Sequence, residues 1–225
     1  MEAVLCRITT PRLENLYIRL FKQLTFSVPC LTQFTNTTDN LRFDNAQILF
    51  NDKEIYVGMS SHEADTDAFF VIVDCVHLDW QVSSVAQISN TLSQAFSAVG
   101  YLSLEHEVHS QSSEEHNEVD RIDWRNFLRS FSNVKTLRVK NGLAEELSRC
   151  LQLEDGELPL ELLPELQELT YFGSRSIGDT FTPFIDARQN AGRPVTLVRG
   201  GPSPIDPEPP VIPPLSDEAG NDIET

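Results

Sequence analysis

The stretch FSNVKTLRV, residues 131–139, places Val134, Leu137 and Val139 in the spacing apolar-x-x-apolar-x-apolar. Leu137 and Val139 alternate with polar residues, as the residues of a half-buried strand do. The preceding segment, 124–131, carries its apolar residues at the i, i+3, i+4, i+7 steps of a helical face. The sequence therefore predicts a helix that leads into a short strand.

The same apolar spacing recurs in four other segments, at Leu13, Leu16 and Ile18; Phe43, Ala46 and Ile48; Val99, Leu102 and Leu104; and Leu166, Leu169 and Tyr171. The copies are 30 residues apart from Ile18 to Ile48, 35 from Leu104 to Val139 and 32 from Val139 to Tyr171. A period near 30 suits a repeated unit of one strand, one turn and one helix. We therefore expect stacked parallel strands at 16–20, 46–50, 102–105, 137–140, 169–172 and 195–198.

A unit of this size cannot bury its apolar face alone, so neighbouring units must cover one another. The pattern predicts an α/β fold of the leucine-rich-repeat-like solenoid type, with degenerate repeats of about 30 residues, parallel strands on the concave face and helices on the convex face. The Asn that usually follows the strand of such repeats occurs only once, as Asn51. An ordinary doubly wound α/β domain is the alternative, because short apolar templates also match its strands. The runs EIYVGM and AFFVIVDCV between the second and third copies suggest a hairpin or an insertion.

Composition predicts two parts, a repeat domain over residues 1–200 and a disordered, Pro-rich, acidic tail over 201–225. From Gly201 onward the chain holds seven of its thirteen prolines and six acids, without a Lys or Arg. Such a segment cannot bury enough apolar surface to offset the entropy of ordering it. No run of 18 apolar residues and no basic, apolar signal segment is present, and the four cysteines form no CxxC pair. These features favour a cytoplasmic or nuclear protein.

Seventeen Lys and Arg residues stand against 34 Asp and Glu residues, which gives a net charge of −17. A chain with this charge repels phosphate backbones and anionic lipid surfaces. We therefore expect neither nucleic acid nor a membrane as a partner.

Two long stretches resemble a known family. They are DWRNFLRSFSNVKTLRV…LAEELSRCLQLEDGELPLELLPELQELTY…FTPFIDARQNAGRPVTLVR and, before it, LRFDNAQILF…FFVIVDC…LDWQVSSVAQISNTL. They are similar to the C-terminal region of the F-box/leucine-rich-repeat-like proteins of mushroom-forming fungi. The resemblance implies the substrate-binding repeat region of a ubiquitin-ligase receptor. The first repeat starts about a dozen residues after Met1, which leaves no room for the helical F-box. Binding to the ligase adaptor is therefore doubtful, and a truncated relative without ligase recruitment is the other expectation.

Candidate chemistry is confined to one polar run, residues 105–116. His106, His109 and His116 lie there among four glutamates, and imidazole and carboxylate groups suit zinc. This makes a metal-assisted hydrolase with a site on the loop around His106–His116 the alternative function. The spacing of His106 and His109 is i, i+3 rather than the i, i+4 of a helical zinc motif, and no Gly-rich phosphate loop or nucleophile motif occurs. We therefore expect a binding protein rather than an enzyme, with no metal and no cofactor.

In a strand of such a repeat, the residues between the apolar positions point to the concave face. This rule predicts a partner-binding surface of Tyr17, Arg19, Gln47, Leu49, Ser103, Glu105, Arg138, Lys140, Thr170 and Phe172. Aromatic anchors and cations on an otherwise acidic protein favour a protein or peptide ligand that is acidic or phosphorylated. The alternative is that these are solvated strand residues without a partner.

Overall fold

We describe the fold from a computed structural model of the chain. The residues that it describes are 16–21, 43–61, 69–107, 118–153, 158, 160–173 and 175–201. Two sequence-based predictions fall outside this set, the tail beyond Gly201 and the loop 108–117.

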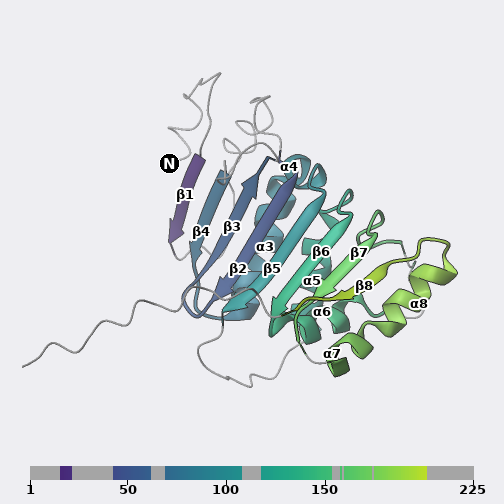
Figure 1. The fold of residues 1–225 in the computed structure, drawn as a ribbon. Coiled ribbons are helices and arrows are strands. Elements are labelled where there is room, and N and C mark those ends of the chain that lie inside the picture. Colours follow the sequence, from purple (N-terminus) through teal and green to yellow (C-terminus); the bar gives the residue numbers. More distant parts are fainter. Residues whose placement is uncertain are drawn as a thin grey trace, which may run out of the picture.

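The described strands form a single mixed sheet of eight strands (Figure 1). In chain order they are β1 (Leu16–Phe21), β2 (Asn45–Asn51), β3 (Glu54–Ser60), β4 (Phe69–Asp74), β5 (Tyr101–Glu107), β6 (Thr136–Asn141), β7 (Glu168–Tyr171) and β8 (Thr196–Arg199). In space they are ordered β1-β4-β3-β2-β5-β6-β7-β8. Only β3 runs antiparallel to its neighbours β2 and β4. The chain is thus an α/β protein. The five predicted strands that correspond to β2, β5, β6, β7 and β8 pair in parallel, in chain order.

The described helices lie together on one side of this sheet. In Figure 1, α3, α5 and α6 are seen behind it, and α7 and α8 at the lower right, next to β8. They are α3 (Leu78–Thr91), α4 (Ser93–Ser97), α5 (Glu118–Arg129), α6 (Leu143–Leu151), α7 (Arg175–Thr180) and α8 (Thr182–Asn190). No helix of the described segments covers the other side, which we call the open face. No described helix is both long and apolar enough to cross a bilayer.

The core forms between the helices and the sheet because the apolar template positions of the strands face the helices. The apolar template residues of the second to fifth copies are 5% exposed or less, namely Phe43, Ala46, Ile48, Val99, Leu102, Leu104, Val134, Leu137, Val139, Leu166, Leu169 and Tyr171. The helical stripe that precedes β6 is equally buried, since Trp124 packs against Phe50 and against Phe127, with ring centroids 5.5 Å and 5.9 Å apart. The alternation read from the sequence is therefore the alternation of burial in the sheet.

The backbone repeats the same connection at the start of each parallel strand. The carbonyl of Asp44 accepts hydrogen bonds from the amides of Gly100 and Tyr101, at 2.8 Å and 3.0 Å. The carbonyls of Gly100 and Lys135, at the equivalent positions of the next two units, accept in the same way from Lys135 and Thr136 and from Gln167 and Glu168. Each unit thus fixes the register of the next one.

Two predictions about this arrangement are wrong. The strand predicted at 16–20 does not lie beside β2, because the antiparallel β3 and β4 come between them and β1 pairs with β4. The pairs Asp79–Trp80 and Asp123–Trp124 suggest two helices that each begin at an Asp followed by a Trp. Asp123 instead lies inside α5, which begins at Glu118, and Trp80 is 54% exposed whereas Trp124 is buried.

Candidate functional site on the open face

The open face gathers the residues that the sequence predicted for a binding surface. Cross-strand register aligns Gln47, Ser103, Arg138 and Thr170 in one row across β2, β5, β6 and β7. The next row holds Leu49, Glu105 and Lys140, and Phe172 follows the end of β7. Most of these side chains are partly or fully exposed, and only Ser103 is buried, at 7%. Tyr17 is in β1, but its side chain is outside the described set.

At the β8 end of the open face, a guanidinium stacks on an aromatic ring. The Arg138 Cζ atom lies 4.6 Å from the centroid of the Phe172 ring, a distance typical of a cation–π contact. A hollow beside this ring is lined by Phe172, Gly173, Arg199, Gly200 and Gly201. Arg199 ends β8 in register with Tyr171, so its side chain leaves the strand on the helix side and borders this hollow at the edge of the sheet. We call Arg138, Phe172 and Arg199, together with these three glycines, the Phe172 corner.

Glycine at position 200 is what allows the Phe172 ring to lie in this place. A Cβ atom at Gly200 would collide with the Cε1 and Cζ atoms of the ring. The Gly200 amide also donates a hydrogen bond of 2.8 Å to the Tyr171 carbonyl, which fixes the chain beside the ring. The corner is therefore built from the ends of β7 and β8.

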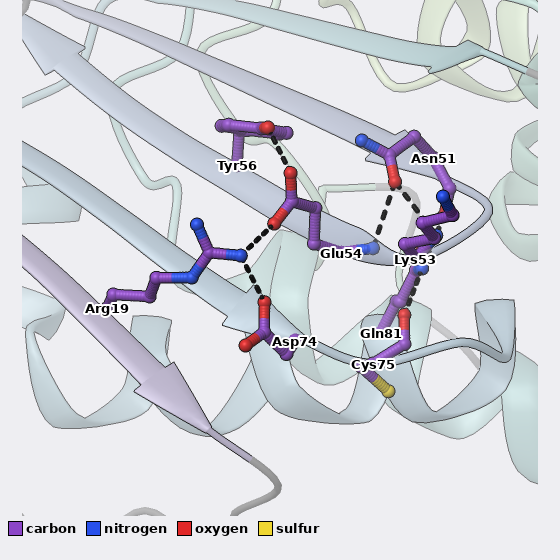
Figure 2. Close-up of polar contacts among 8 residues, drawn as sticks. All are labelled: Arg19, Asn51, Lys53, Glu54, Tyr56, Asp74, Cys75 and Gln81. Carbon is purple, nitrogen blue, oxygen red and sulfur yellow. Dashed lines mark hydrogen bonds and ion pairs between the residues drawn. The ribbon is translucent and has the colours of Figure 1, made fainter.

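At the opposite end of the open face, Arg19 is neutralised by the protein itself (Figure 2). Its Nη2 atom lies 2.8 Å from a carboxylate oxygen of Glu54 and 2.8 Å from one of Asp74. The other carboxylate oxygen of Glu54 accepts a hydrogen bond from the Tyr56 hydroxyl. Strands β3 and β4 thus supply two carboxylates beside Arg19, and its role in binding a partner stays a prediction.

A tightly bonded turn places Glu54 in this cluster. The Asn51 Oδ1 atom accepts hydrogen bonds of 2.9 Å from the amides of Lys53 and Glu54 (Figure 2). The buried Gln81 of α3 then donates from Nε2 to the carbonyls of Asn51 and Cys75, at 2.6 Å and 2.7 Å. Helix α3 thereby ties the end of β2 to the end of β4, so that Glu54 and Asp74 lie at the same edge.

In the middle of the open face, the cation is also paired. Lys140 Nζ lies 2.8 Å from an oxygen of Glu105, directly across from it on β5. Both side chains are largely shielded, at 25% and 18% exposure, which favours this pair over one in free solvent. Lys140 is therefore less available to a partner than its place in the row suggests.

The residues of the alternative metal site are not brought together where the structure describes them. Glu105 belongs to the open face, whereas the neighbouring His106 lies on the helix side of β5, as alternation along a strand requires. Burial lowers the pKa of His106, and the nearby Asp52 partly offsets this shift. No group of three His, Cys, Asp or Glu side chains is close enough to hold a metal ion in the described segments, and His109 and His116 lie outside them.

The residues that set the charge at the two ends of the sheet were not identified from the sequence. Glu54, Tyr56 and Asp74 lie in or at the ends of the runs suspected of forming a hairpin, and their alternation could have placed them on the open face. Their pairing with Arg19 has no local signal, because Arg19 is 35 residues from Glu54 and 55 from Asp74. Arg199 was overlooked because it ends the closing strand in register with Tyr171, on the helix side of the sheet.

Comparison with known proteins adds no family to this description. No family model matches the chain, and no curated protein or solved structure shows significant similarity to it.

Proposed function

We propose that the chain is a protein–protein interaction scaffold that binds a protein or peptide ligand on the open face of its sheet. One observation carries this proposal: a broad and mainly parallel sheet has helices on only one side among the described residues. In ordinary α/β domains helices cover both faces of such a sheet. A parallel sheet with one bare face thus offers a wide surface for a partner, and the strand residues on it are mixed polar, charged and aromatic.

We further infer that β2 and β5 to β8 are degenerate leucine-rich repeats. The repeated double hydrogen bond at Asp44, Gly100 and Lys135 supports this interpretation, as does the burial of the repeated apolar template. The segment from β3 to β4 is then an insertion that widens the sheet beyond the first of these strands. Repeat proteins commonly use the concave strand surface to bind their partners.

The family resemblance gives this scaffold a cellular role. By that resemblance, the chain is the substrate-binding repeat region of an F-box-type ubiquitin-ligase receptor, or a truncated relative without ligase recruitment. The bound protein would be a ligase substrate in the first case. In the second case the scaffold would hold its partner without delivering it for ubiquitination.

Quantitative affinity capture with matched variants tests the scaffold. The full chain, a Gln47→Arg variant on the open face and an Asn90→Arg variant on α3 are each immobilised and exposed to an extract of the source cells. Both positions are exposed amides, so the two variants make the same chemical change on opposite sides. We expect at least one protein to be captured by the full chain and by Asn90→Arg but lost with Gln47→Arg.

The proposal fails if the three proteins capture the same set, or if only Asn90→Arg loses a partner. Melting curves of the variants must coincide with that of the parent, so that a loss of binding is not a loss of folding. The presence of a cullin-ligase adaptor in all three captured sets would separate a ligase receptor from a truncated relative.

A further inference from the structure

The cations of the Phe172 corner have no carboxylate partner among the described residues, unlike several others on the protein. Several described cations lie within 4 Å of an acid, namely Arg19, Arg129, Lys140, Arg149 and Arg193. Neither Arg138 nor Arg199 has an ion pair in the described part of the chain. Both cations adjoin the Phe172 ring on a protein whose net charge is −17.

Arg138 is held by stacking rather than by hydrogen bonds. Its guanidinium lies over the Phe172 ring, and its Nε atom is shielded from solvent without a hydrogen-bond partner. A guanidinium that is oriented by an aromatic ring loses little further freedom when its remaining N–H groups bind an acceptor. An unmatched buried donor also costs free energy that a bound acceptor can recover.

Arg199 is oriented by the backbone of the same corner. Its Nε atom donates a hydrogen bond of 3.0 Å to the carbonyl of Gly173. The two terminal nitrogens of the guanidinium take no part in that bond. Arg199 and Phe172 line the same hollow, together with glycines that carry no side chain to fill it. The lining of the hollow therefore combines the apolar ring of Phe172 with the cation of Arg199.

The nearest acids of the open face are already engaged. Glu105 pairs with Lys140, and Glu168 accepts a hydrogen bond of 3.0 Å from the Thr170 hydroxyl. Glu168 nevertheless lies one row from Arg138 without pairing with it. Neither acid forms an ion pair with Arg138 among the described residues, so its guanidinium has no carboxylate partner there.

We propose that the Phe172 corner is the anchor point for an acidic peptide segment of the partner. A carboxylate of Asp or Glu binds the guanidinium of Arg138 or Arg199, and an adjacent apolar side chain enters the hollow against Phe172. Arg is well suited to this role, because its planar fork matches the geometry of a carboxylate. This inference rests on the proposed function, since it names the chemistry of the ligand for one end of the open face.

Selection of peptides tests the proposal before the partner is identified. Random linear peptides displayed on phage are selected on the full chain, and the recovered peptides are synthesised and measured by fluorescence anisotropy. We expect recovered peptides to carry Asp or Glu next to an apolar residue. Their affinity should fall about tenfold or more with Arg138→Glu and with Arg199→Glu, because each variant removes a charge-assisted hydrogen bond and adds a repulsive carboxylate.

Lys135→Glu is the matched control, since Lys135 is exposed, has no ion pair among the described residues and lies at the other end of β6. It should change the affinity by much less than the corner variants, although all three change the net charge equally. Arg138→Gln and Arg199→Gln serve as second variants, and they remove the charge without adding a repulsive one. Replacing Glu by Gln in the peptide should cost a similar factor.

Several outcomes would overturn the anchor. They are recovery of no peptides, recovery of neutral or basic peptides, and acidic peptides that bind the corner variants and the parent equally. Self-association of the parent that Arg138→Glu abolishes would assign the corner to a second copy of the chain instead. If peptides lose binding with Gln47→Arg but not with the corner variants, the anchor is wrong while the open face remains the binding surface.

Discussion

At the β1 end of the open face, Arg19 shares two carboxylates, whereas Arg138 toward the β8 end, and Arg199 at the adjoining edge of the sheet, have none among the described residues. The direction of the strands explains this difference. Antiparallel β3 and β4 place the start of one strand beside the end of the other, so that Glu54 and Asp74 lie opposite each other. Parallel β7 and β8 bring their two ends together instead, and those ends are Phe172-Gly173 and Gly200-Gly201. One end of the same face is thus closed electrostatically, and the other is open to an anion.

The largest expected effect is a loss of stability from core substitutions, and it should be the same in β3 and in β6. Ile55 of β3 and Leu137 of β6 are both 0% exposed, on the helix side of the sheet. Replacing either by Ala should lower the free energy of unfolding by about 2–5 kcal/mol, through lost burial and the cavity left behind. Chemical denaturation of the two variants measures this. A cost well below that range for Ile55 alone would mean that the two ends differ in their core as well as in their charge.

The next effect should separate the ends. Glu54→Gln removes the Glu54 carboxylate from Arg19, which keeps Asp74, and it weakens the bond to the Tyr56 hydroxyl. The stability should fall by about 0.5–1 kcal/mol, because Arg19 is 41% exposed and ion pairs of exposed groups contribute little. Salt at about 1 M should shrink the difference, since the screening length is then about 3 Å. An equal cost at low and high salt would show that the charge of Glu54 is not what stabilises this end.

Much of the fold could be read from the sequence because burial on one side of a strand leaves a period of two. The template residues around β2, β5, β6 and β7 were found in this way, and so were the open-face positions between them. The place of β1 could not be read, because pairing with β4 depends on contacts 53 residues apart that leave no local pattern. Local similarity also failed to distinguish Trp80 from Trp124. Both follow an Asp, but only Trp124 meets an aromatic ring of the sheet.

A smaller loss of stability is expected for Arg138 in the Phe172 corner, which has no ion pair among the described residues. Arg138→Gln removes no ion pair in the described part of the chain, only the cation–π contact with Phe172. Its cost in stability should stay within about 0.5–1 kcal/mol, the range for such a contact at an exposed site. The same substitution should weaken the peptides selected on the corner by a much larger factor. A stability loss above about 2 kcal/mol would make Arg138 a structural residue, and the comparison between the two ends would then have to be revised.

The last effect distinguishes the two faces of β5, the strand between these ends. Burial lowers the pKa of His106 below its ordinary value of 6.5, so the folded protein holds this imidazole neutral where the unfolded chain already binds a proton. More protons are then bound in the unfolded state, and stability must decrease as the pH falls through 6.5 toward the lower folded-state pKa. His106→Gln should flatten this part of the stability curve, measured as the denaturation midpoint from about pH 7.5 to about pH 5, while the parent keeps its slope. Because Glu105 lies on the opposite face and pairs with Lys140, Glu105→Gln should leave the slope between those pH values unchanged. If both substitutions flatten the curve equally, the two faces of β5 are coupled, and the helix side contributes to the charge balance of the open face.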